Sequence, residues 1–372
     1  MVKNQIKARI ALEDGTVFEG FSFTGSKESE GEVVFNTSLT GYQEVVTDPS
    51  YFGQIVVMTY PLIGNYGINL DDSESLSPKI AGFVVKEYSR ISSNWRSNKD
   101  LGSYLKENKV LGIEGVDTRA LVGRIRIKGA MKAIISTSKK TNKELIEKAK
   151  KSKGIIGQDL VKNVTAKKSY FWNNSGKYKV VVLDCGVKFN ILRMLQQNKC
   201  KVFVMPAHSN SKEILKQKPD GVMISNGPGD PAAVSYLIEE VKNLLGKVPL
   251  FGICLGNQIL GLAQGAKTYK LKFGHHGGNH PVKDLRTGRI SITVQNHGFC
   301  LDPNTLDKKN LEITHINLND HTVEGLRHKK MPISSVQFHP ESCPGSHDAQ
   351  YLFSDFIKMI KKFKMVEGKR RM

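Results

Sequence analysis

A short apolar run that ends in a glycine-flanked cysteine constrains this chain of 372 residues more than any other feature. Residues 248–253 form an apolar run of strand length. Cys254 follows, with Gly252 and Gly256 on either side, and a helix-compatible run starts at Asn257. This G-x-C-x-G spacing is that of a sharp strand-to-helix turn, whose glycines let a nucleophile project from the strand end. The amides at the start of the helix would favour the thiolate. The alternative is a structural cysteine, since free cysteines are often buried.

Before this turn, strand and helix patterns alternate at the spacing of βαβ units. The expected strands are 178–184, 201–205, 221–225 and 249–253, and the expected helices are 190–197, 211–218 and 233–245. Such alternation predicts an open, largely parallel sheet. Ligands of these sheets bind beyond the carboxyl ends of the strands. Because the Asn-Gly-Pro-Gly loop at 226–229 and Cys254 both follow strands, we expect them to share one cleft.

The N-terminal part of the chain has short strand patterns, many turns and no chemical motif. Residues 8–20 hold two strand patterns around Glu-Asp-Gly, which is a hairpin signal, and Asp117 is placed as a helix N-cap. Further strand patterns of this part lie at 32–35, 54–60 and 80–85, and helix patterns at 101–108 and 142–151. After Cys254, a strand pattern lies at 289–294 and a helix pattern at 348–363. We predict a mixed α/β domain over 1–152, a connecting segment over 153–177 and an α/β domain over 178–372.

A base for the cysteine is expected after a later strand pattern, at 333–338. His339 follows it directly, and Pro340 stiffens the turn. Glu341 projects to the same side as His339, because side chains two positions apart share one face of an extended segment. Its carboxylate could hold one imidazole nitrogen and leave the other facing Cys254. The set Cys254, His339 and Glu341 fits acyl transfer through a thioester, whereas a surface His-Pro-Glu turn is the alternative.

Acyl transfer also needs hydrogen-bond donors for the oxyanion, and these are usually backbone amides. The amide of Leu255, directly after the cysteine, is one such donor by the geometry of the turn. The loop 226–229 has almost no side-chain bulk, so a second amide can approach closely. An ordinary tight turn is the alternative for this loop.

The histidines and cysteines form no recognisable metal site. His275, His276 and His280, with His297 nearby, have a spacing that fits no common zinc signature, so we expect structural or hydrogen-bonding roles and no metal. The five cysteines are odd in number and scattered, and no CxxC pair occurs, which argues against a disulfide framework. We therefore expect a reducing, cytoplasmic location.

The formal net charge of +20 raises the question of nucleic-acid binding. The lysines are spread along the whole chain, and no RNP, helix-turn-helix or zinc-finger spacing accompanies them. We therefore predict no nucleic-acid partner. The N-terminus has no apolar core of a signal peptide, and no apolar run approaches the roughly 20 residues that span a bilayer, so we expect no membrane association.

Three ordered motifs resemble those of the class I, triad-type glutamine amidotransferases. They are Ser225-Asn-Gly-Pro-Gly-Asp-Pro231, Phe251-Gly-Ile-Cys-Leu-Gly-Asn-Gln258 and Gln337-Phe-His-Pro-Glu341. Other segments are similar to the small chain of carbamoyl-phosphate synthetase, namely 32–44, 47–51, 60–65, 116–119 and 272–281. The resemblance implies an N-terminal small-chain domain that docks a partner, followed by an amidotransferase domain with a flavodoxin-like core.

The same resemblance implies hydrolysis of L-glutamine to glutamate, with the ammonia passed to a separate large chain. That partner would make carbamoyl phosphate from bicarbonate and ATP, for arginine and pyrimidine synthesis, in a hetero-oligomer of small and large chains. ATP and magnesium would bind to the partner, and no cofactor to this chain. In agreement, the sequence has no G-x-x-x-x-G-K-[ST] loop.

By motif match, Cys254 is the nucleophile, His339 the base and acid, and Glu341 the residue that orients it. The glutamine contacts implied by the resemblance are Ser50, Gly227, Gly229, Leu255, Gln258, Asn296, Gly298 and Phe299. Of these, Gly227 and Leu255 would supply oxyanion amides.

Asn257 stands where the family usually has a histidine. Both side chains form hydrogen bonds and the position is not that of the base, so we expect activity to survive. Two other hypotheses remain at this point. One is an amidotransferase that serves another synthetase, and the other is a catalytically inactive regulatory or nucleic-acid-binding relative.

Overall fold

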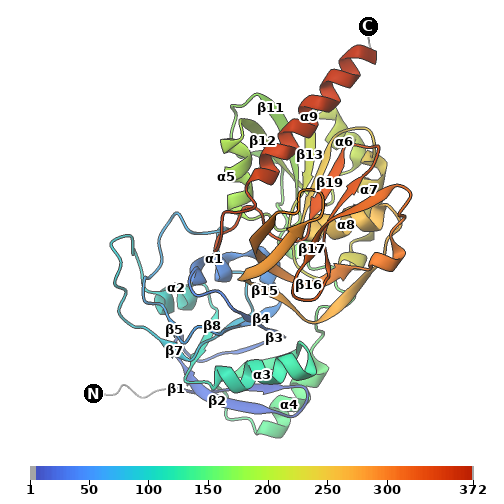
Figure 1. Cartoon of the computed structure of the whole chain (residues 1–372). Coiled ribbons are helices and arrows are strands. Elements are labelled where there is room, and N and C mark those ends of the chain that lie inside the picture. The colour runs from blue at the N-terminus through green and yellow to red at the C-terminus, as the bar shows by residue number, and fades with distance from the viewer. Residues whose placement is uncertain (1–5, 371–372) are drawn as a thin grey trace. The chain divides into compact units, whose positions relative to one another are not determined.

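The computed structural model describes residues 6–370 and divides the chain into two compact units (Figure 1). The first unit runs to Ile156 and also includes Lys272–Gly277. The second unit comprises Gly157–Leu271 and the chain from Gly278 on. Each unit has its own hydrophobic core and is described by itself.

The strands of the first unit close into a barrel. In barrel order they are β1 (Ile6–Leu12), β2 (Val17–Ser22), β8 (Leu111–Glu114), β6 (Gly82–Val84), β4 (Gln54–Met58), β3 (Glu28–Asn36) and β9 (Met131–Ser136), which pairs with β1. The predicted hairpin at 8–20 is the antiparallel pair β1–β2. Ile10, Val33 and Ile55 belong to one fully buried cluster that includes residues of most of these strands. Side chains therefore fill the barrel, as in other small barrels.

Short helices complete the first unit. They are α1 (Tyr42–Thr47), the 3₁₀ turn η1 (Pro49–Tyr51), α2 (Leu101–Glu107), α3 (Thr118–Lys128) and α4 (Asn142–Lys151). Two further strands, β5 (Leu62–Ile63) and β7 (Glu87–Tyr88), pair with each other outside the barrel. Asp117 caps α3 as predicted, because its carboxylate accepts the amide of Ala120 at 3.0 Å. The prediction of a mixed α/β unit is confirmed, but its closure into a barrel was not anticipated.

The second unit is built on a ten-stranded sheet. Its order is β10 (Tyr170–Phe171), β12 (Cys200–Pro206), β11 (Tyr178–Asp184), β13 (Gly221–Ile224), β14 (Leu250–Ile253), β19 (Ile333–Val336), β18 (Val323–His328), β17 (Leu311–Asn317), β15 (Thr268–Asp284) and β16 (Ile290–Leu301). The five strands from β12 to β19 are parallel and follow the order 2-1-3-4-5 along the chain. This is the flavodoxin-like order, so the predicted fold class is confirmed.

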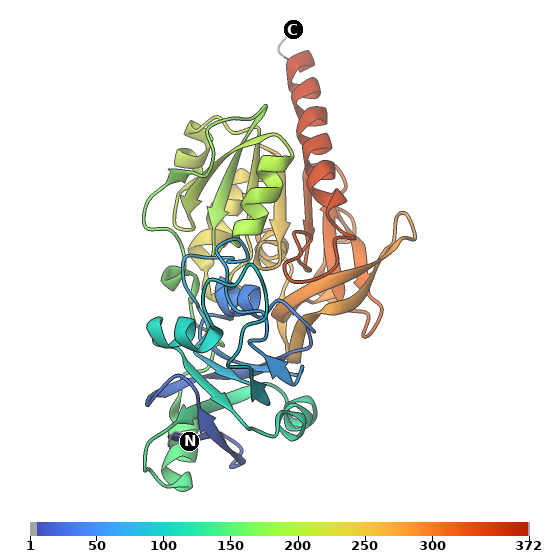
Figure 2. The ribbon, with the colours of Figure 1, turned by 90° about the vertical axis from the view of Figure 1, so that its left-hand side faces the viewer.

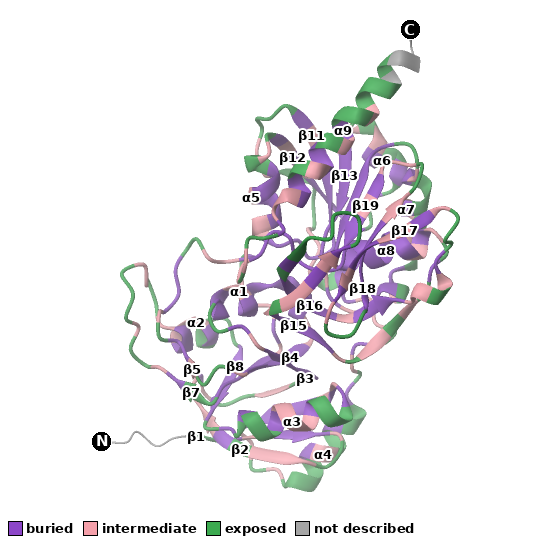
Figure 3. Cartoon of the chain, viewed as in Figure 1, coloured by how far each residue is buried: buried purple, intermediate pink, exposed green. Residues whose placement is uncertain are grey.

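Helices cover both faces of this parallel centre (Figures 1 and 2). The helices are α5 (Phe189–Gln197), α6 (Ser211–Lys216), α7 (Ser235–Leu244), α8 (Leu255–Ala263) and α9 (Tyr351–Arg370), with 3₁₀ turns η2 (Val161–Asn163), η3 (Pro231–Ala233) and η4 (Pro303–Thr305). Val180 and Val182 of β11 pack with α5 and α9, whereas Val181 and Leu183 pack with α6, α7 and α8. Burial on both faces explains why these strands are continuous apolar runs (Figure 3).

Two parts of the second unit differ from the predictions. A connecting segment was expected over 153–177, but residues 157–177 belong to this unit, and β10 extends its sheet by pairing with β12. The ring of Phe171 lies 4.6 Å from that of Phe203, its partner on β12. No strand was predicted over residues 265–280, which are rich in glycine and histidine, but most of them lie within the long strand β15. Strand β16 also continues past the expected end at 294.

The packing of α9 on the sheet gives a first prediction. Phe356 is 1% exposed, and its ring is stacked on that of Phe251 with centroids 5.4 Å apart. Phe356→Ala should lower the free energy of unfolding by about 3–5 kcal/mol, because it removes a buried ring and leaves a cavity. Thermal unfolding followed by circular dichroism measures the loss. Met365→Ala, at a 67% exposed position of the same helix, is the control and should change little. Equal effects of the two substitutions would contradict this account of α9.

Candidate active site

The turn at Cys254 has the strained backbone that its sequence predicts. Cys254 has φ 56° and ψ −105° and lies directly before α8. A positive φ is rare for a residue with a Cβ and is typical of functional sites. A Cβ at Gly252 would lie 2.5 Å from the carbonyl oxygen of Gly256, and a Cβ at Gly256 only 2.1 Å from that of Ile224. Both flanking positions therefore require glycine, and α8 begins at Leu255, two residues earlier than expected.

The pairing of β14 with β19 brings the predicted base to the cysteine. These parallel neighbours pair Ile253 with Val336, and the amide of Cys254 donates to the Val336 carbonyl at 2.9 Å. Adjacent parallel strands end at the same edge of a sheet. His339 follows β19 at that edge, and its amide donates to the carbonyl of Val294 at 2.9 Å. Residues 254 and 339, far apart in sequence, therefore lie at one edge.

Glu341 holds the imidazole of His339 as expected. Its Oε1 lies 2.7 Å from Nδ1 of His339, and both side chains are buried. Within the described part of the chain, Nε2 of His339 makes no hydrogen bond of normal geometry. Cys254 is nevertheless close enough for its sulfur to affect the titration of the ring.

The charges of this group favour an ionised His339–Glu341 pair. Burial alone would lower the pKa of His339, but the charges of Glu341 and Cys254 outweigh it and raise this pKa to about 10. Burial alone would likewise raise the pKa of Glu341, but Lys188 and His339 lower it to about 2. At neutral pH the ring is therefore an imidazolium beside the sulfur and the acid a carboxylate.

Lys188 is a member of this group that sequence reasoning missed. It is 2% exposed, and its Nζ lies 3.0 Å from Oε1 of Glu341. The same ammonium donates to the carbonyls of Ser342 at 2.7 Å and Cys343 at 2.9 Å. A buried lysine requires such partners, because an unpaired buried charge is strongly destabilising. The sequence feature that could have identified Lys188 is its position shortly after β11, because ligands bind at the carboxyl ends of such strands.

A network of buried amides holds the sulfur from the other side. Nε2 of Gln337 lies 3.7 Å from Sγ of Cys254 and donates to it. Oε1 of Gln337 accepts from Asn257 at 3.2 Å and from Gln258 at 3.0 Å, and Asn257 accepts in turn from the hydroxyl of Ser335 at 2.8 Å. Asn257, the departure from the family pattern, thus supports Gln337.

The expected oxyanion loop packs against the start of α8. A Cβ at Gly227 would lie 2.2 Å from the carbonyl oxygen of Cys185 and 2.8 Å from Cδ2 of Leu255, so no side chain fits there. The backbone carbonyl of Ser225 accepts a hydrogen bond from the amide of Gly256 at 3.1 Å, which fixes the loop to the helix. Gly229 has φ +90° and lies instead against Gln158 and Leu160. The structure therefore brings Gly227 and Leu255 together.

Of the predicted contacts on β16, Asn296 lies beside the sulfur and Phe299 beside Gln258. Sγ of Cys254 lies 3.5 Å from the carbonyl oxygen of Asn296, and Gln258 donates to the carbonyl of Phe299 at 2.7 Å. Gly298 has no atom within 4 Å of an added Cβ, so open space adjoins it. His297 contacts Gln295 and Phe299 through its two ring nitrogens, at 2.9 and 2.8 Å, which is the hydrogen-bonding role expected of it.

Ser50 belongs to the first unit. It lies in η1, is 7% exposed, and its amide donates to the carboxylate of Asp48 at 2.9 Å. Its contact with glutamine was inferred from the resemblance alone and stays a prediction. His275 and His276 also belong to the first unit, in its Lys272–Gly277 segment.

Comparison with known proteins places the chain in a family. The model of the carbamoyl-phosphate synthase small chain domain matches residues 10–135, and that of the class-I glutamine amidotransferases matches residues 181–359. The carbamoyl phosphate synthase small chain of Aquifex aeolicus is 55% identical over 365 residues, which cover 95% of this chain and 98% of that protein. The chain belongs to the carbamoyl phosphate synthase small chain family. It is therefore an enzyme, a glutamine-hydrolysing amidotransferase subunit.

Other relatives of this small chain span nearly its whole length. The small chain of Syntrophotalea carbinolica is 52% identical over 98% of this chain and 100% of its own length. The pyrimidine-specific small chain of Bacillus subtilis is 49% identical over 95% of this chain and 96% of its own. A solved structure described as a putative GMP synthase subunit from Thermoplasma acidophilum covers 51% of this chain and 98% of its own, with 22% identity and a TM-score of 0.45. Within residues 6–370, no helix is long and apolar enough to cross a bilayer.

The lowered pKa of Glu341 predicts a pH dependence of stability. A carboxylate whose pKa falls on folding stabilises the protein above its unfolded pKa of 4.5, and this contribution is lost as the pH falls towards about 2. The stability of the wild type relative to Glu341→Gln should therefore shrink as the pH falls from 4.5 towards 2, a range in which His339 of the wild type stays protonated. Urea unfolding at several pH values measures it, and a difference that does not change with pH would rule out this ion group.

The amide network predicts a role for Gln337 in positioning the sulfur. Gln337→Leu removes the N–H donor to Cys254 and should lower kcat for glutamine hydrolysis about tenfold with KM little changed, since one hydrogen bond to a charged group contributes about 1.5 kcal/mol or more. Asn257→His, which restores the usual family residue, should keep most of the activity. A Gln337→Leu variant with normal kcat would contradict the role.

Proposed function

We propose that Cys254, His339 and Glu341 hydrolyse L-glutamine to glutamate and ammonia through a thioester on Cys254. The geometry of the three side chains carries this proposal. A cysteine on a strained turn lies at the same strand edge as a histidine whose other nitrogen is 2.7 Å from a buried carboxylate. Such a nucleophile, base and orienting group is the arrangement of covalent acyl transfer. Membership of the small-chain family supports glutamine as the substrate.

In the first half of the reaction, the sulfur of Cys254 attacks the side-chain amide carbon of glutamine. The carbon–nitrogen bond then breaks while His339 gives its proton to the departing nitrogen, which leaves as ammonia. The raised pKa of His339 supports this step, because burial is outweighed by Glu341 and Cys254 and the ring holds a proton at neutral pH. A thioester and a neutral imidazole remain.

In the second half, the neutral His339 takes a proton from water as the oxygen attacks the thioester carbon. The carbon–sulfur bond breaks, glutamate leaves, and the thiolate and imidazolium are restored. The sum is glutamine plus water giving glutamate plus ammonia. Glu341 stays ionised throughout and stabilises the imidazolium, as its lowered pKa supports, since Lys188 and His339 outweigh its burial.

The amides of Gly227 and Leu255 would bind the oxyanion of both tetrahedral intermediates. The lack of a side chain at Gly227 supports this, because an added Cβ would lie 2.8 Å from Cδ2 of Leu255 and glycine lets the two residues pack together. Other glutamine contacts are proposed at Ser50, Gly229, Gln258, Asn296, Gly298 and Phe299. Both Nε2 protons of Gln258 are used by Phe299 and Gln337, so its Oε1 would accept from the ammonium of the substrate.

A large chain would receive the ammonia and make carbamoyl phosphate from bicarbonate and ATP. Similarity to proteins named small chains supports such a partner and a hetero-oligomer of the two. ATP and magnesium would bind to that partner, without a cofactor on this chain. The product would serve pyrimidine synthesis, as the name of the Bacillus subtilis relative indicates for that protein, and arginine synthesis. We further propose a cytoplasmic location and no nucleic-acid partner.

Substitution of the nucleophile tests this function. In a complex reconstituted with the large chain, Cys254→Ser should abolish glutamine-dependent carbamoyl phosphate synthesis and leave ammonia-dependent synthesis unchanged, because only ammonia supply is lost. Cys300→Ser is the matched control, since Cys300 is also buried and its thiol contacts the carbonyl of Val323, a contact that a hydroxyl can replace. Retained use of glutamine by Cys254→Ser would exclude Cys254 as the nucleophile. Loss of ammonia-dependent synthesis would refute the proposed division of labour.

A further inference from the structure

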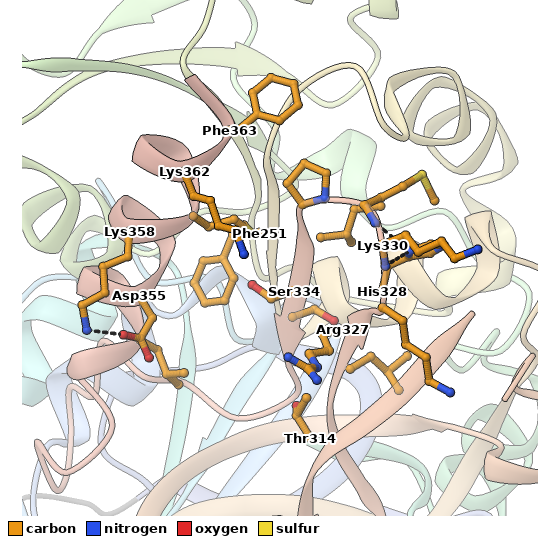
Figure 4. A pocket seen from close by; sticks show the side chains of 18 of the residues that line it. Phe251, Thr314, Arg327, His328, Lys330, Ser334, Asp355, Lys358, Lys362 and Phe363 are labelled. Atoms are coloured by element: carbon orange, nitrogen blue, oxygen red, sulfur yellow. Dashed lines mark hydrogen bonds and ion pairs between the residues drawn. The ribbon is translucent and has the colours of Figure 1, made fainter. Parts of the chain in front are cut away.

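A cavity of about 670 Å³ lies in the second unit between α9 and the β18–β19 hairpin (Figure 4). Its lining includes neither Cys254 nor His339 nor Glu341, so it is separate from the candidate active site. Sites for small organic ligands usually have volumes of about 300–1,000 Å³. The cavity is therefore of a size that encloses such a ligand.

One wall of the cavity is apolar. Leu352, Met359 and Phe363 of α9 line it, and their spacing of seven and four residues places them on one face of the helix. Phe251 lies on the sheet side, where it pairs across the strands with Ser334 of β19. Aromatic and thioether side chains of this kind pack well against a flat ring.

The rest of the lining is strongly basic. Its cations are Arg286, Arg327, Lys329, Lys330, Lys358 and Lys362. The one carboxylate among the described lining residues is that of Asp355, which pairs with Lys358 at 2.8 Å. Among the side chains that the structure describes, which exclude Glu367, no carboxylate pairs with Lys330 or Lys362. Arg327 binds Glu312 through Nε and Nη2, at 2.9 and 2.7 Å, and Nη1 takes no part in that pair. Positive charge thus exceeds negative charge around the cavity.

The loop that carries two of these lysines is held in place by His328. Its Nδ1 accepts the amides of Lys330 at 3.0 Å and Met331 at 2.9 Å. A nitrogen that accepts two hydrogen bonds carries no proton, so Nε2 of this ring is a donor. The backbone at Lys330 is therefore fixed beside the cavity before any ligand binds, which lowers the entropic cost of binding.

An independent observation comes from His315 in the cavity wall. This side chain is 3% exposed, and Nδ1 meets the hydroxyl of Thr314 at 2.9 Å. Among the residues that the structure describes, none forms a hydrogen bond with its Nε2. Burial, opposed by Asp284, lowers the pKa of His315 to about 4, so the ring is neutral. A buried polar atom without a partner costs free energy, and a ligand with a polar group would remove that cost.

We propose that this cavity binds a small organic phosphate with a planar ring, of the nucleoside phosphate type. The ring lies against Leu352, Met359 and Phe363, and the phosphates are bound by Lys330, Lys362 and Arg327. Inorganic phosphate alone would not cover the apolar wall, and a nucleoside without phosphate would not pair with the cations. Only a ligand with both parts is complementary to the whole lining. Because neither Cys254 nor His339 nor Glu341 lines the cavity, the ligand acts as an effector and takes no part in glutamine hydrolysis itself.

Isothermal titration calorimetry of the full chain tests the proposal, with ADP, adenosine and inorganic phosphate as probes. ADP should bind, and each of the other two should bind at least about tenfold more weakly, because each makes only part of the contacts. Lys330→Glu and Lys362→Glu should each weaken ADP binding about tenfold or more, since each replaces a charge-assisted hydrogen bond by repulsion. Both lysines are exposed, so the variants should fold normally.

Lys361→Glu is the matched control. It makes the same change of charge on the neighbouring residue of α9, which is exposed and does not line the cavity. It should leave ADP affinity unchanged within about twofold if binding depends on direct contact. If Lys361→Glu and Lys362→Glu lost ADP affinity equally, the proposal would be overturned, because binding would then depend on the general positive charge of the surface and not on direct contacts. Absence of ADP binding, or equal binding of ADP and a single-stranded oligonucleotide at the same lysines, would overturn it as well.

Discussion

The parallel pairing of β14 with β19 is the constraint on which the active site depends. It places Cys254, one residue beyond β14, at the same edge as His339, three residues beyond β19. A slip by one residue would turn every side chain of β19 to the opposite face. Ser335 would then no longer reach Asn257, and the residues after the strand would lose their orientation towards the sulfur. Burial of this sheet on both faces fixes the register.

At this edge of the sheet, the active site contains three buried charged groups that are stable only in one another's presence. Lys188, Glu341 and His339 are each almost fully buried, and each would be costly to bury alone. Lys188 lies 3.0 Å and His339 2.7 Å from the same carboxylate oxygen of Glu341, so one acid compensates two cations. These contacts keep the histidine protonated beside the cysteine. Electrostatics and backbone geometry therefore determine the chemistry together.

Strand β19 also connects the active site with the basic cavity. Ser334 and Ser335 both line the cavity, and the hydroxyl of Ser335 also donates to Asn257 in the network that supports the sulfur. One residue of this short strand thus contacts both the cavity and the active-site network. The cavity exists because α9 covers β14 and leaves the face of β18 and β19 partly open, which is visible beside the helix (Figure 4).

The sequence by itself determined the elements whose signals are local. Apolar runs predicted the parallel strands, and the G-x-C-x-G spacing predicted the turn at Cys254 together with its small neighbours. The roles of Lys188 and Gln337 could not be predicted in this way, because their partners are distant in the sequence. Lys188 donates to the carbonyl of Ser342, 154 residues away, and Gln337 accepts from Gln258, 79 residues away. Closure of the barrel and the course of β15 through a glycine-rich stretch depend likewise on pairing with distant strands. Only the tertiary structure decided these features, because a buried charge or a strand edge is stable only once its partner lies beside it.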